Sequence, residues 1–271
     1  MLKLGVITDE ISQDLEYALK VMKEIGAEYA ELRGVWGKNI MRQSDEEVRE
    51  VKRLLEKYGA PVSVLATPFL KIHVDSVDDY REHLKYLEKA IRIAKFLDTD
   101  KIRVFSFWRR PDRSRWLDRV VDALREFGDI ARDEGIVLVL ENEASCMVAT
   151  GAETLEIISR AGVPNLKVIW DPGNAYAAGE TPYPDGYLAI RNHVVHMHVK
   201  DCALINGRKR WVAIGSGMID YVSQFKALVK DGYDGVISLE THYKIDDNRE
   251  AATRESFAGL LRTLEKAFNR G

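Results

Sequence analysis

Short apolar runs rich in β-branched residues alternate with longer amphipathic segments along this chain of 271 residues, and this alternation restricts the possible folds more than any other feature. Several runs are apolar at nearly every position, for example residues 136–140. Such continuous runs suit strands that are buried on both faces, as in parallel sheets. We expect strands at Leu4–Thr8, Tyr29–Arg33, Val62–Ala66, Ile102–Phe107, Val137–Glu141, Val168–Asp171, Val194–Val199 and Val236–Glu240.

The segments between these runs predict helices. Apolar residues recur in them at three- and four-residue spacing, which places the apolar side chains on one helical face. Ser44 with Glu47, and Thr150 with Glu153, match the capping-box pattern that starts a helix. Glycines stand at positions 26 and 59, where two of the helices should end.

Strand and helix thus alternate about eight times, which predicts a (β/α)₈ barrel with residues 1–271 as a single domain. An open, doubly wound sheet is the alternative. No Gly-x-Gly-x-x-Gly motif follows the first run, so a dinucleotide-binding fold gains no support. We expect irregular stretches around Pro172–Gly186 and Ala203–Met218, both on the side where barrels keep their active sites.

Composition and charge argue against several classes of protein. The formal net charge is −3, whereas a general nucleic-acid binder normally carries a strong basic excess. The two cysteines, Cys146 and Cys202, are too few for a disulfide framework or a zinc-thiolate site, and we expect two reduced thiols. The sequence shows no signal-peptide pattern and no apolar run long enough to span a membrane. We therefore expect a cytoplasmic protein without nucleic-acid or membrane partners.

Ionisable residues stand at the ends of four successive runs. Glu141 closes the fifth run, Asp171 the sixth and Glu240 the eighth, while His198 lies near the end of the seventh. In a closed barrel these ends converge on one mouth. Three carboxylates there would repel one another unless a cation neutralised them. Carboxylates with one imidazole suit Mn²⁺, Mg²⁺, Co²⁺ or Zn²⁺, so the pattern favours a metal site over a network of salt bridges.

Six short motifs are spread from the first expected strand to the last. They are Ile-Thr-Asp-Glu (7–10), Leu-Glu-Asn-Glu (140–143), Trp-Asp-Pro-Gly-Asn (170–174), His-Met-His-Val-Lys-Asp (196–201), Ile-Gly-Ser-Gly (214–217) and Ser-Leu-Glu-Thr-His (238–242). In their order and spacing they resemble the xylose isomerase-like barrel superfamily, whose members are commonly labelled sugar phosphate isomerases or epimerases. The resemblance is specific for the superfamily and not for one substrate.

The resemblance implies a cofactor and its ligands. These are one divalent ion (Mn, Co, Mg or Zn) held by Glu141, Asp171, His198 and Glu240. His196 points to the same side by strand parity, and we expect it to be a hydrogen-bonded core histidine. In ketose epimerases of the superfamily, the third residue after the metal-binding aspartate is a histidine that touches the substrate. Asn174 stands there in this chain, which leaves the exact reaction open.

The resemblance also implies an isomerase or epimerase that acts on a small sugar or polyol. Proton removal beside a carbonyl gives an enediolate, whose charge a divalent metal stabilises. Glu141 and Glu240 would exchange protons with the carbon from opposite faces. The expected substrate contacts are Asn174, Lys200, Trp108, Trp211 and Glu143. Tryptophans at a barrel mouth can form apolar walls for a sugar ring, although each could instead simply cover the barrel end.

Other charged residues near the expected mouth are expected mainly to be solvated and not to bind the substrate. Arg109, Arg110, Arg113 and Arg115 are expected to form a solvated helix start with aspartate partners at 112 and 118, rather than a phosphate site. Asp201 and His242 are expected to be solvated loop residues. Either Asn142 or Glu143 could orient the first expected ligand, Glu141, without binding the ion itself.

Three other functions compete with this one. An endonuclease IV-like enzyme needs an Asp-x-His pair just before Ile-Gly-x-Gly, where this chain has Lys-Arg-Trp (209–211), so DNA repair is rejected. Inosose and dehydroshikimate dehydratases share the barrel, the metal and the first proton abstraction, and this alternative stays open. A non-catalytic sugar-binding barrel would be favoured by a missing ligand, whereas all four are present. Superfamily members often form dimers or tetramers, so a homo-oligomer is also open.

Overall fold

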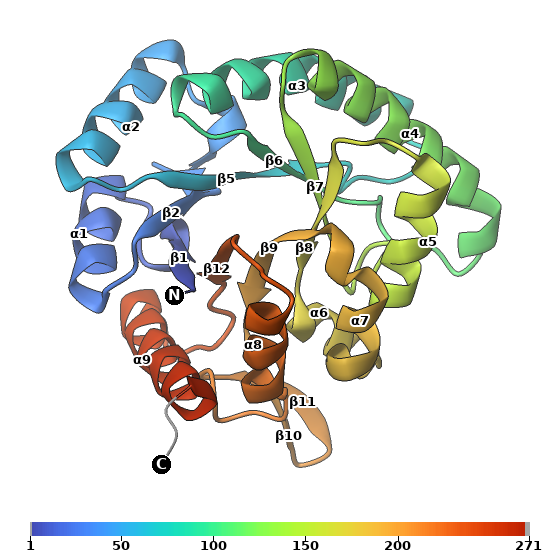
Figure 1. The fold of residues 1–271 in the computed structure, drawn as a ribbon. Coiled ribbons are helices and arrows are strands. Elements are labelled where there is room, and N and C mark those ends of the chain that lie inside the picture. Colours follow the sequence, from blue (N-terminus) through green and yellow to red (C-terminus); the bar gives the residue numbers. More distant parts are fainter. Residues whose placement is uncertain (1, 269–271) are drawn as a thin grey trace.

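The expected apolar runs form one closed ring of parallel strands in the computed structural model, which describes residues 2–268 (Figure 1). The barrel strands are β1 (Lys3–Ile7), β2 (Tyr29–Leu32), β5 (Val62–Phe69), β6 (Lys101–Val104), β7 (Val137–Glu141), β8 (Leu166–Trp170), β9 (Val194–Val199) and β12 (Val236–Leu239). β12 pairs with both β9 and β1, and β1 pairs with β2, which closes the ring. The predicted (β/α)₈ barrel is confirmed.

Helices follow the strands and surround the ring (Figure 1). They are α1 (Leu15–Ile25), α2 (Asp45–Tyr58), α3 (Val77–Phe96), α4 (Arg113–Asp133), α5 (Gly151–Ala161), α6 (Pro172–Ala177), α7 (Tyr187–Ile190), α8 (Tyr221–Lys230) and α9 (Arg249–Phe268). Shorter helical turns are η1 (Thr8–Glu10), η2 (Ile40–Arg42), η3 (Pro182–Gly186) and η4 (Arg191–His193). The capping box of Ser44 and Glu47 starts α2 as expected, and Thr150 accepts a hydrogen bond from the backbone N–H of Glu153 at the start of α5.

Three sequence predictions need correction. The sixth strand of the chain, β6, ends at Val104 and not at Phe107, because Phe107 has a left-handed backbone (φ 62°) that cannot continue a strand. The stretch Pro172–Gly186 is not irregular throughout, since it contains α6. The stretch Ala203–Met218 contains most of a hairpin of β10 (Asp201–Ile205) and β11 (Arg208–Val212). A smaller hairpin, β3 (Gly34–Val35) with β4 (Lys38–Asn39), follows β2.

Part of the inside of the barrel, below the strand ends, is lined by apolar side chains. Val64, Val139 and Ile169 form a small cluster that is separate from the large core between strands and helices. Val139 precedes Glu141 by two residues, and Ile169 precedes Asp171 by two, so each pair projects to the same face of its strand. Glu141 and Asp171 therefore lie directly above buried apolar side chains. Among residues 2–268, no helix combines the length and apolar character needed to cross a bilayer.

Candidate metal centre

Four buried side chains from successive strand ends meet at the mouth of the barrel. They are Glu141, Asp171, His198 and Glu240, and each offers one donor atom within 4.8 Å of the donor atoms of the others. Glu141 ends β7, Asp171 follows β8, His198 lies in β9 and Glu240 follows β12. The sequence predicted that these residues would converge, and the structure brings all four together. Their role as metal ligands stays a prediction.

Asp171 is held by the start of α6. Its Oδ1 accepts the backbone N–H of Asn174 at 2.8 Å, so Asp171 is the N-cap of this helix. The side chain of Asn142 fixes the backbone of Asp171 from both sides, donating to its carbonyl at 2.9 Å and accepting its N–H at 2.8 Å. Oδ2 is left to face the cluster, where Lys200 Nζ lies 2.8 Å away. Burial raises the pKa of Asp171 to about 6, although Lys200 opposes this shift.

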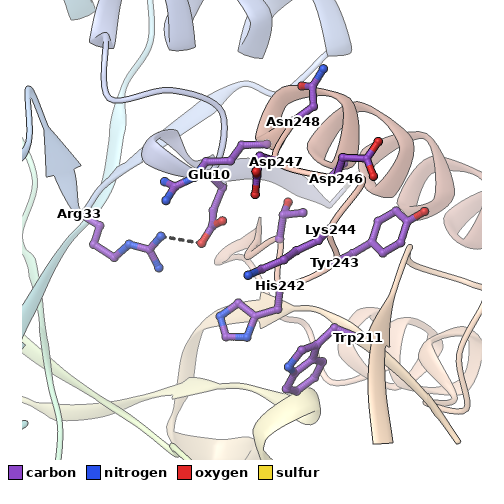
Figure 2. Close-up of a pocket in the computed structure, with 12 residues that line it drawn as sticks. Glu10, Arg33, Trp211, His242, Tyr243, Lys244, Asp246, Asp247 and Asn248 are labelled. Carbon is purple, nitrogen blue, oxygen red and sulfur yellow. Dashed lines mark hydrogen bonds and ion pairs between the residues drawn. The ribbon is translucent and has the colours of Figure 1, made fainter. Parts of the chain in front are cut away.

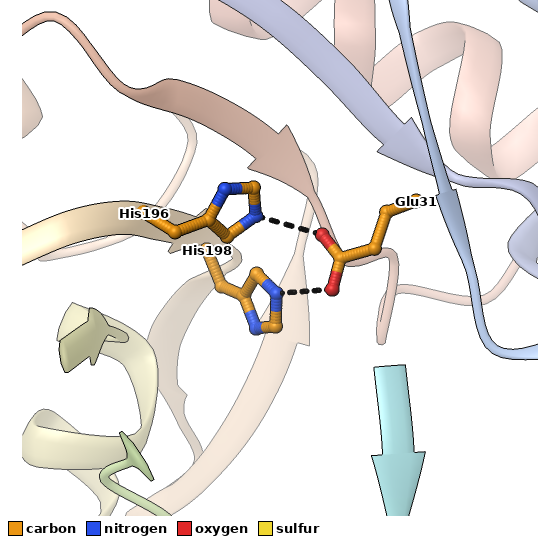
Figure 3. Close-up of side chains that lie close together, drawn as sticks. All are labelled: Glu31, His196 and His198. Carbon is orange, nitrogen blue, oxygen red and sulfur yellow. Dashed lines mark hydrogen bonds and ion pairs between the residues drawn. The ribbon is translucent and has the colours of Figure 1, made fainter. Parts of the chain in front are cut away.

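His198 presents its two ring nitrogens to different partners. Nε2 lies 2.9 Å from Glu31 Oε1, and Nδ1 lies 3.4 Å from Glu141 Oε1 and 4.0 Å from Asp171 Oδ2. His196 contacts the other oxygen of Glu31 at 2.8 Å (Figure 3). His196 is therefore the hydrogen-bonded core histidine that the sequence predicted.

Glu141 is enclosed by donors on both oxygens. Arg103 Nη1 donates to Oε2 at 3.0 Å, and Asn174 Nδ2 donates to Oε1 at 3.2 Å. The side chains of Arg103 and Glu141 are only 6% and 2% exposed. Burial raises the pKa of Glu141, but the charges of His198 and Arg103 outweigh burial and lower the pKa to about 2. Glu141 is thus an ionised carboxylate at neutral pH.

Glu240 is held by a lysine and an arginine, and a histidine lies close to it. Lys200 donates to Oε2, and Arg33 Nη1 donates to Oε1 at 3.2 Å. Nε2 of His242 lies 3.6 Å from the same Oε1. Burial raises the pKa of Glu240, but Lys200 and then His242 hold it well below its usual range.

The residues present fit a divalent cation. Asp171 Oδ2 and His198 Nδ1 are fully buried and have no hydrogen-bond partner, since the ion pair of Lys200 with Asp171 lacks hydrogen-bond geometry. Leaving His198 Nδ1 without a partner is costly unless an ion takes its lone pair, and Asp171 Oδ2 has only the ion pair with Lys200. Three carboxylates and one imidazole are donors that Mn²⁺, Mg²⁺, Co²⁺ and Zn²⁺ accept. This cluster could therefore hold a divalent metal.

A pocket of about 490 Å³ opens beside Glu240 (Figure 2). Arg33 and Glu10, joined by an ion pair, form one wall, and Trp211 and His242 form another. The rings of Trp211 and His242 meet edge to face with centroids 5.2 Å apart. Since Arg33 and His242 both contact Glu240, the pocket lies next to the cluster of four buried donors.

The predicted substrate contacts have different surroundings. Trp211 lines the pocket, whereas Asn174 and Lys200 are buried within the cluster itself. Trp108 and Glu143 do not line this pocket. Both contact Lys71, whose Nζ lies 2.8 Å from a Glu143 oxygen and 5.3 Å from the Trp108 ring centroid.

Two residues expected in solvated loops have other surroundings. Asp201 is buried and its carboxylate accepts backbone N–H groups of the loop that contains Ile-Gly-Ser-Gly, at Gly215 and Gly217 among others. His242 is half-buried against Trp211. The expectation of a solvated loop residue is wrong for Asp201, whereas His242 lies in the loop after β12 with 35% of its side chain exposed.

Three arginines of the cluster form ion pairs, but not with the expected aspartates alone, and Arg115 instead lies over the ring of Trp116. Arg109 and Arg113 form ion pairs with Glu153 on α5, and Arg110 pairs with Asp75 and weakly with Asp112. Asp118 instead pairs with Arg160.

Three charged residues of the site were missed at the sequence level. Glu31, Arg33 and Arg103 belong to or directly follow strands in the first half of the barrel, and all three contact a residue of the cluster. The available signal was a single charge inside an apolar run, as in Ala-Glu-Leu (30–32) and Ile-Arg-Val (102–104). A lone charge in a buried strand must find a partner inside the barrel.

This chain is similar to a known protein family and to several known proteins. A family model described as a xylose isomerase-like TIM barrel matches residues 19–264. An uncharacterized protein of Methanocaldococcus jannaschii is 27% identical over 208 residues, which are 73% of this chain and 70% of that protein. A 3-dehydroshikimate dehydratase of Bacillus anthracis is 22% identical over 184 residues, 66% of this chain and 63% of the relative.

An inosose dehydratase of Lacticaseibacillus casei is 25% identical over 138 residues, 45% of this chain and 46% of that enzyme. The match therefore spans about half the length of this relative.

Solved structures share the fold along nearly the whole chain. A 3-keto-D-glucoside 4-epimerase from E. coli superposes with a TM-score of 0.76 at 22% identity, covering 97% of this chain and 100% of that chain. A D-tagatose 3-epimerase-like protein gives 0.77 at 24% identity, covering 98% of both chains. The IolI protein, solved with a zinc atom, gives 0.79 at 18% identity, covering 99% of this chain and 100% of that chain. At these identities the likeness shows the fold.

Proposed function

Because this chain belongs to the xylose isomerase-like TIM barrel family, we propose that it is a divalent-metal-dependent isomerase or epimerase of a small sugar or polyol. The observation that carries the proposal is the convergence of four buried donors, two of whose atoms have no hydrogen-bond partner, beside a pocket of substrate size. We also propose that residues 1–271 form a single domain of this family.

The proposed ligands are the same four residues that the sequence singled out. They are Glu141, Asp171, His198 and Glu240. Glu31, Glu141, Asp171 and Glu240 bring four carboxylates together, whereas Arg103 and Lys200 are the only buried lysine or arginine side chains that contact them within residues 2–268. When bound, a divalent ion would supply the remaining positive charge and stabilise an enediolate.

The two glutamates are proposed to move the proton. Glu240 lies beside the pocket, so its carboxylate is placed to take a proton from the carbon next to a substrate carbonyl. Glu141 comes from a different strand. Because it is ionised at neutral pH, it would first take a proton from water and then return that proton to the carbon from the opposite face. Lys200 contacts Glu240 and carries three N–H donors, so it could also donate a hydrogen bond to a substrate oxygen.

Trp211 and Arg33 are proposed to shape the binding of the substrate. The ring of Trp211 forms an apolar wall of the pocket, which suits the C–H face of a sugar. Arg33 reaches both the pocket and Glu240. A substrate between these two side chains would lie next to the proposed base.

Dehydration is the second candidate reaction. It is favoured by the relatives named inosose dehydratase and 3-dehydroshikimate dehydratase. Both reactions begin by removing a proton beside a carbonyl, and loss of a β-hydroxyl then replaces reprotonation. The same two glutamates would serve either outcome.

The test uses purified protein loaded with Mn²⁺ in D₂O and a panel of ketoses, 3-keto-glucosides, inosose and 3-dehydroshikimate. We expect deuterium to enter one substrate at the carbon next to its carbonyl, as read by NMR. Glu141→Gln and Glu240→Gln should each lower this rate by about 10²–10⁴-fold while circular dichroism stays unchanged. Loss of water from inosose or 3-dehydroshikimate would select the dehydratase.

A matched control is Glu180→Gln, which changes a half-buried carboxylate that accepts the N–H of Gly151 at the start of α5. This variant should keep the wild-type rate. Full activity in both Glu141→Gln and Glu240→Gln would contradict the proposed roles.

A further inference from the structure

Glu31 lies across the barrel from the strand that carries both inner histidines. It belongs to β2, whereas His196 and His198 belong to β9, and β12 and β1 stand between these strands in the ring. The contact therefore crosses the inside of the barrel and does not run along the sheet (Figure 3). All three side chains are at most 1% exposed, so water does not compete for their hydrogen bonds.

Each oxygen of Glu31 takes one histidine. Oε1 is 2.9 Å from Nε2 of His198, and Oε2 is 2.8 Å from Nε2 of His196. A carboxylate only accepts hydrogen bonds, so the hydrogen of each ring lies on Nε2. Nδ1 of His198 is then left as the nitrogen that faces Glu141 and Asp171.

The distances argue against an ion between Glu31 and the two histidines. Donors that share one tetrahedral ion at about 2.0–2.2 Å stand roughly 3.4 Å apart. The two oxygen–nitrogen distances at Glu31 are shorter and typical of direct hydrogen bonds. Nδ1 of His198, in contrast, is buried and has no hydrogen-bond partner.

We propose that Glu31 is a positioning residue of the metal centre, which holds Nε2–H of His198 and so presents Nδ1 to the ion. His196 takes the second oxygen and keeps the Glu31 carboxylate from turning away. Imidazole ligands whose other nitrogen donates to a carboxylate are fixed in orientation and bind metal more tightly. The inference rests on the proposed metal centre and assigns the ligating atom.

The first test is spectroscopic and uses the wild-type protein. With ¹⁵N-labelled histidine and bound Zn²⁺, NMR shows which ring nitrogen of His198 carries the ion and which carries hydrogen. We expect the ion on Nδ1 and a slowly exchanging hydrogen on Nε2. An ion on Nε2 would overturn the inference whether or not any variant folds.

The second test measures the affinity for Mn²⁺ alone by calorimetric titration. Glu31→Gln keeps the shape of the side chain but leaves only one accepting oxygen for two histidines. We expect its dissociation constant to rise about 10–100-fold and the His198 Nε2 hydrogen to exchange faster. The control Glu180→Gln should match the wild type.

The outcomes separate this inference from the proposed function. Wild-type protein that binds no divalent ion would overturn the metal centre, and the inference with it. Binding in the wild type with an equal affinity in Glu31→Gln would overturn the role of Glu31 and leave the metal centre standing.

Discussion

Glu141 and Glu240 hold equivalent places at the ends of β7 and β12 but have different surroundings. The partners of Glu141 are buried, and its arginine partner is only 6% exposed. Arg33, the corresponding partner of Glu240, is 26% exposed and lines the pocket. A small molecule would therefore reach the centre from the Glu240 side, with Glu141 on the closed side.

We expect His83 on α3 to make stability depend on pH. Its Nδ1 accepts the backbone N–H of Leu70 at 3.0 Å, and burial lowers its pKa. As the pH falls through about 6.5, the unfolded chain binds a proton that the folded chain binds less tightly, so the free energy of unfolding decreases. We predict that wild type loses more of this free energy between about pH 7.5 and 5.5 than His83→Gln does, measured by urea denaturation. Equal losses would contradict this role.

At the scale of single residues, sequence reasoning found the side chains that end apolar runs. Glu141, Asp171 and Glu240 each follow the last apolar residue of a strand, so their position alone placed them at the mouth. Glu31 and Arg103 lie within strands, and what they contact depends on how the ring closes. Pairing across a barrel is a tertiary property that local pattern does not encode.

At the scale of elements, the first turn of α6 packs directly on Lys200. A Cβ added to Gly173 would lie 2.5 Å from Lys200 Cγ and 3.0 Å from its backbone oxygen, so Lys200 would have to shift. We predict that Gly173→Ala displaces Lys200 from Asp171, costs about 1–3 kcal/mol of stability by overpacking, and lowers Mn²⁺ affinity. Thermal unfolding and calorimetric titration measure the two effects.

Gly128→Ala is the matched control for this prediction. Its Cβ would lie 2.5 Å from Val163 Cγ1, between α4 and the residues after α5. This variant should lose stability but bind Mn²⁺ as the wild type does. If Gly173→Ala also kept its affinity, the contact between α6 and Lys200 would have no role in the centre.

The elements that sequence reasoning found and those that it missed differ in length and period. Barrel strands carry clear apolar patterns, and their predicted bounds lie within three residues of the observed ones. The apolar spacing of the long helices predicts that they exist but not their bounds. α6 spans 6 residues, too few for a helical period to show. The hairpin of β10 and β11 turns at Asn206-Gly207, both with positive φ, and Asn-Gly is a sequence signal for such a turn.

At the scale of the whole molecule, a bound ion should stabilise the fold. The proposed ligands come from four strands, so an ion that binds them favours the closed barrel over the unfolded chain. At about 100 times its dissociation constant, Mn²⁺ should add about 2.7 kcal/mol and raise Tm by about 5 °C. EDTA should reverse the shift, and Asp171→Asn should show little or none. A Tm that ignores Mn²⁺ in the wild type would contradict the centre.

Anomalous diffraction from a crystal grown with Mn²⁺ tests the central claim most directly. The account predicts one strong peak at the barrel mouth, about 2.0–2.3 Å from an oxygen of Glu141, Asp171 and Glu240 and from Nδ1 of His198. The absence of a peak there, or a peak bound by other residues while Glu141, Asp171 and Glu240 stay paired with Arg103 and Lys200, would contradict it.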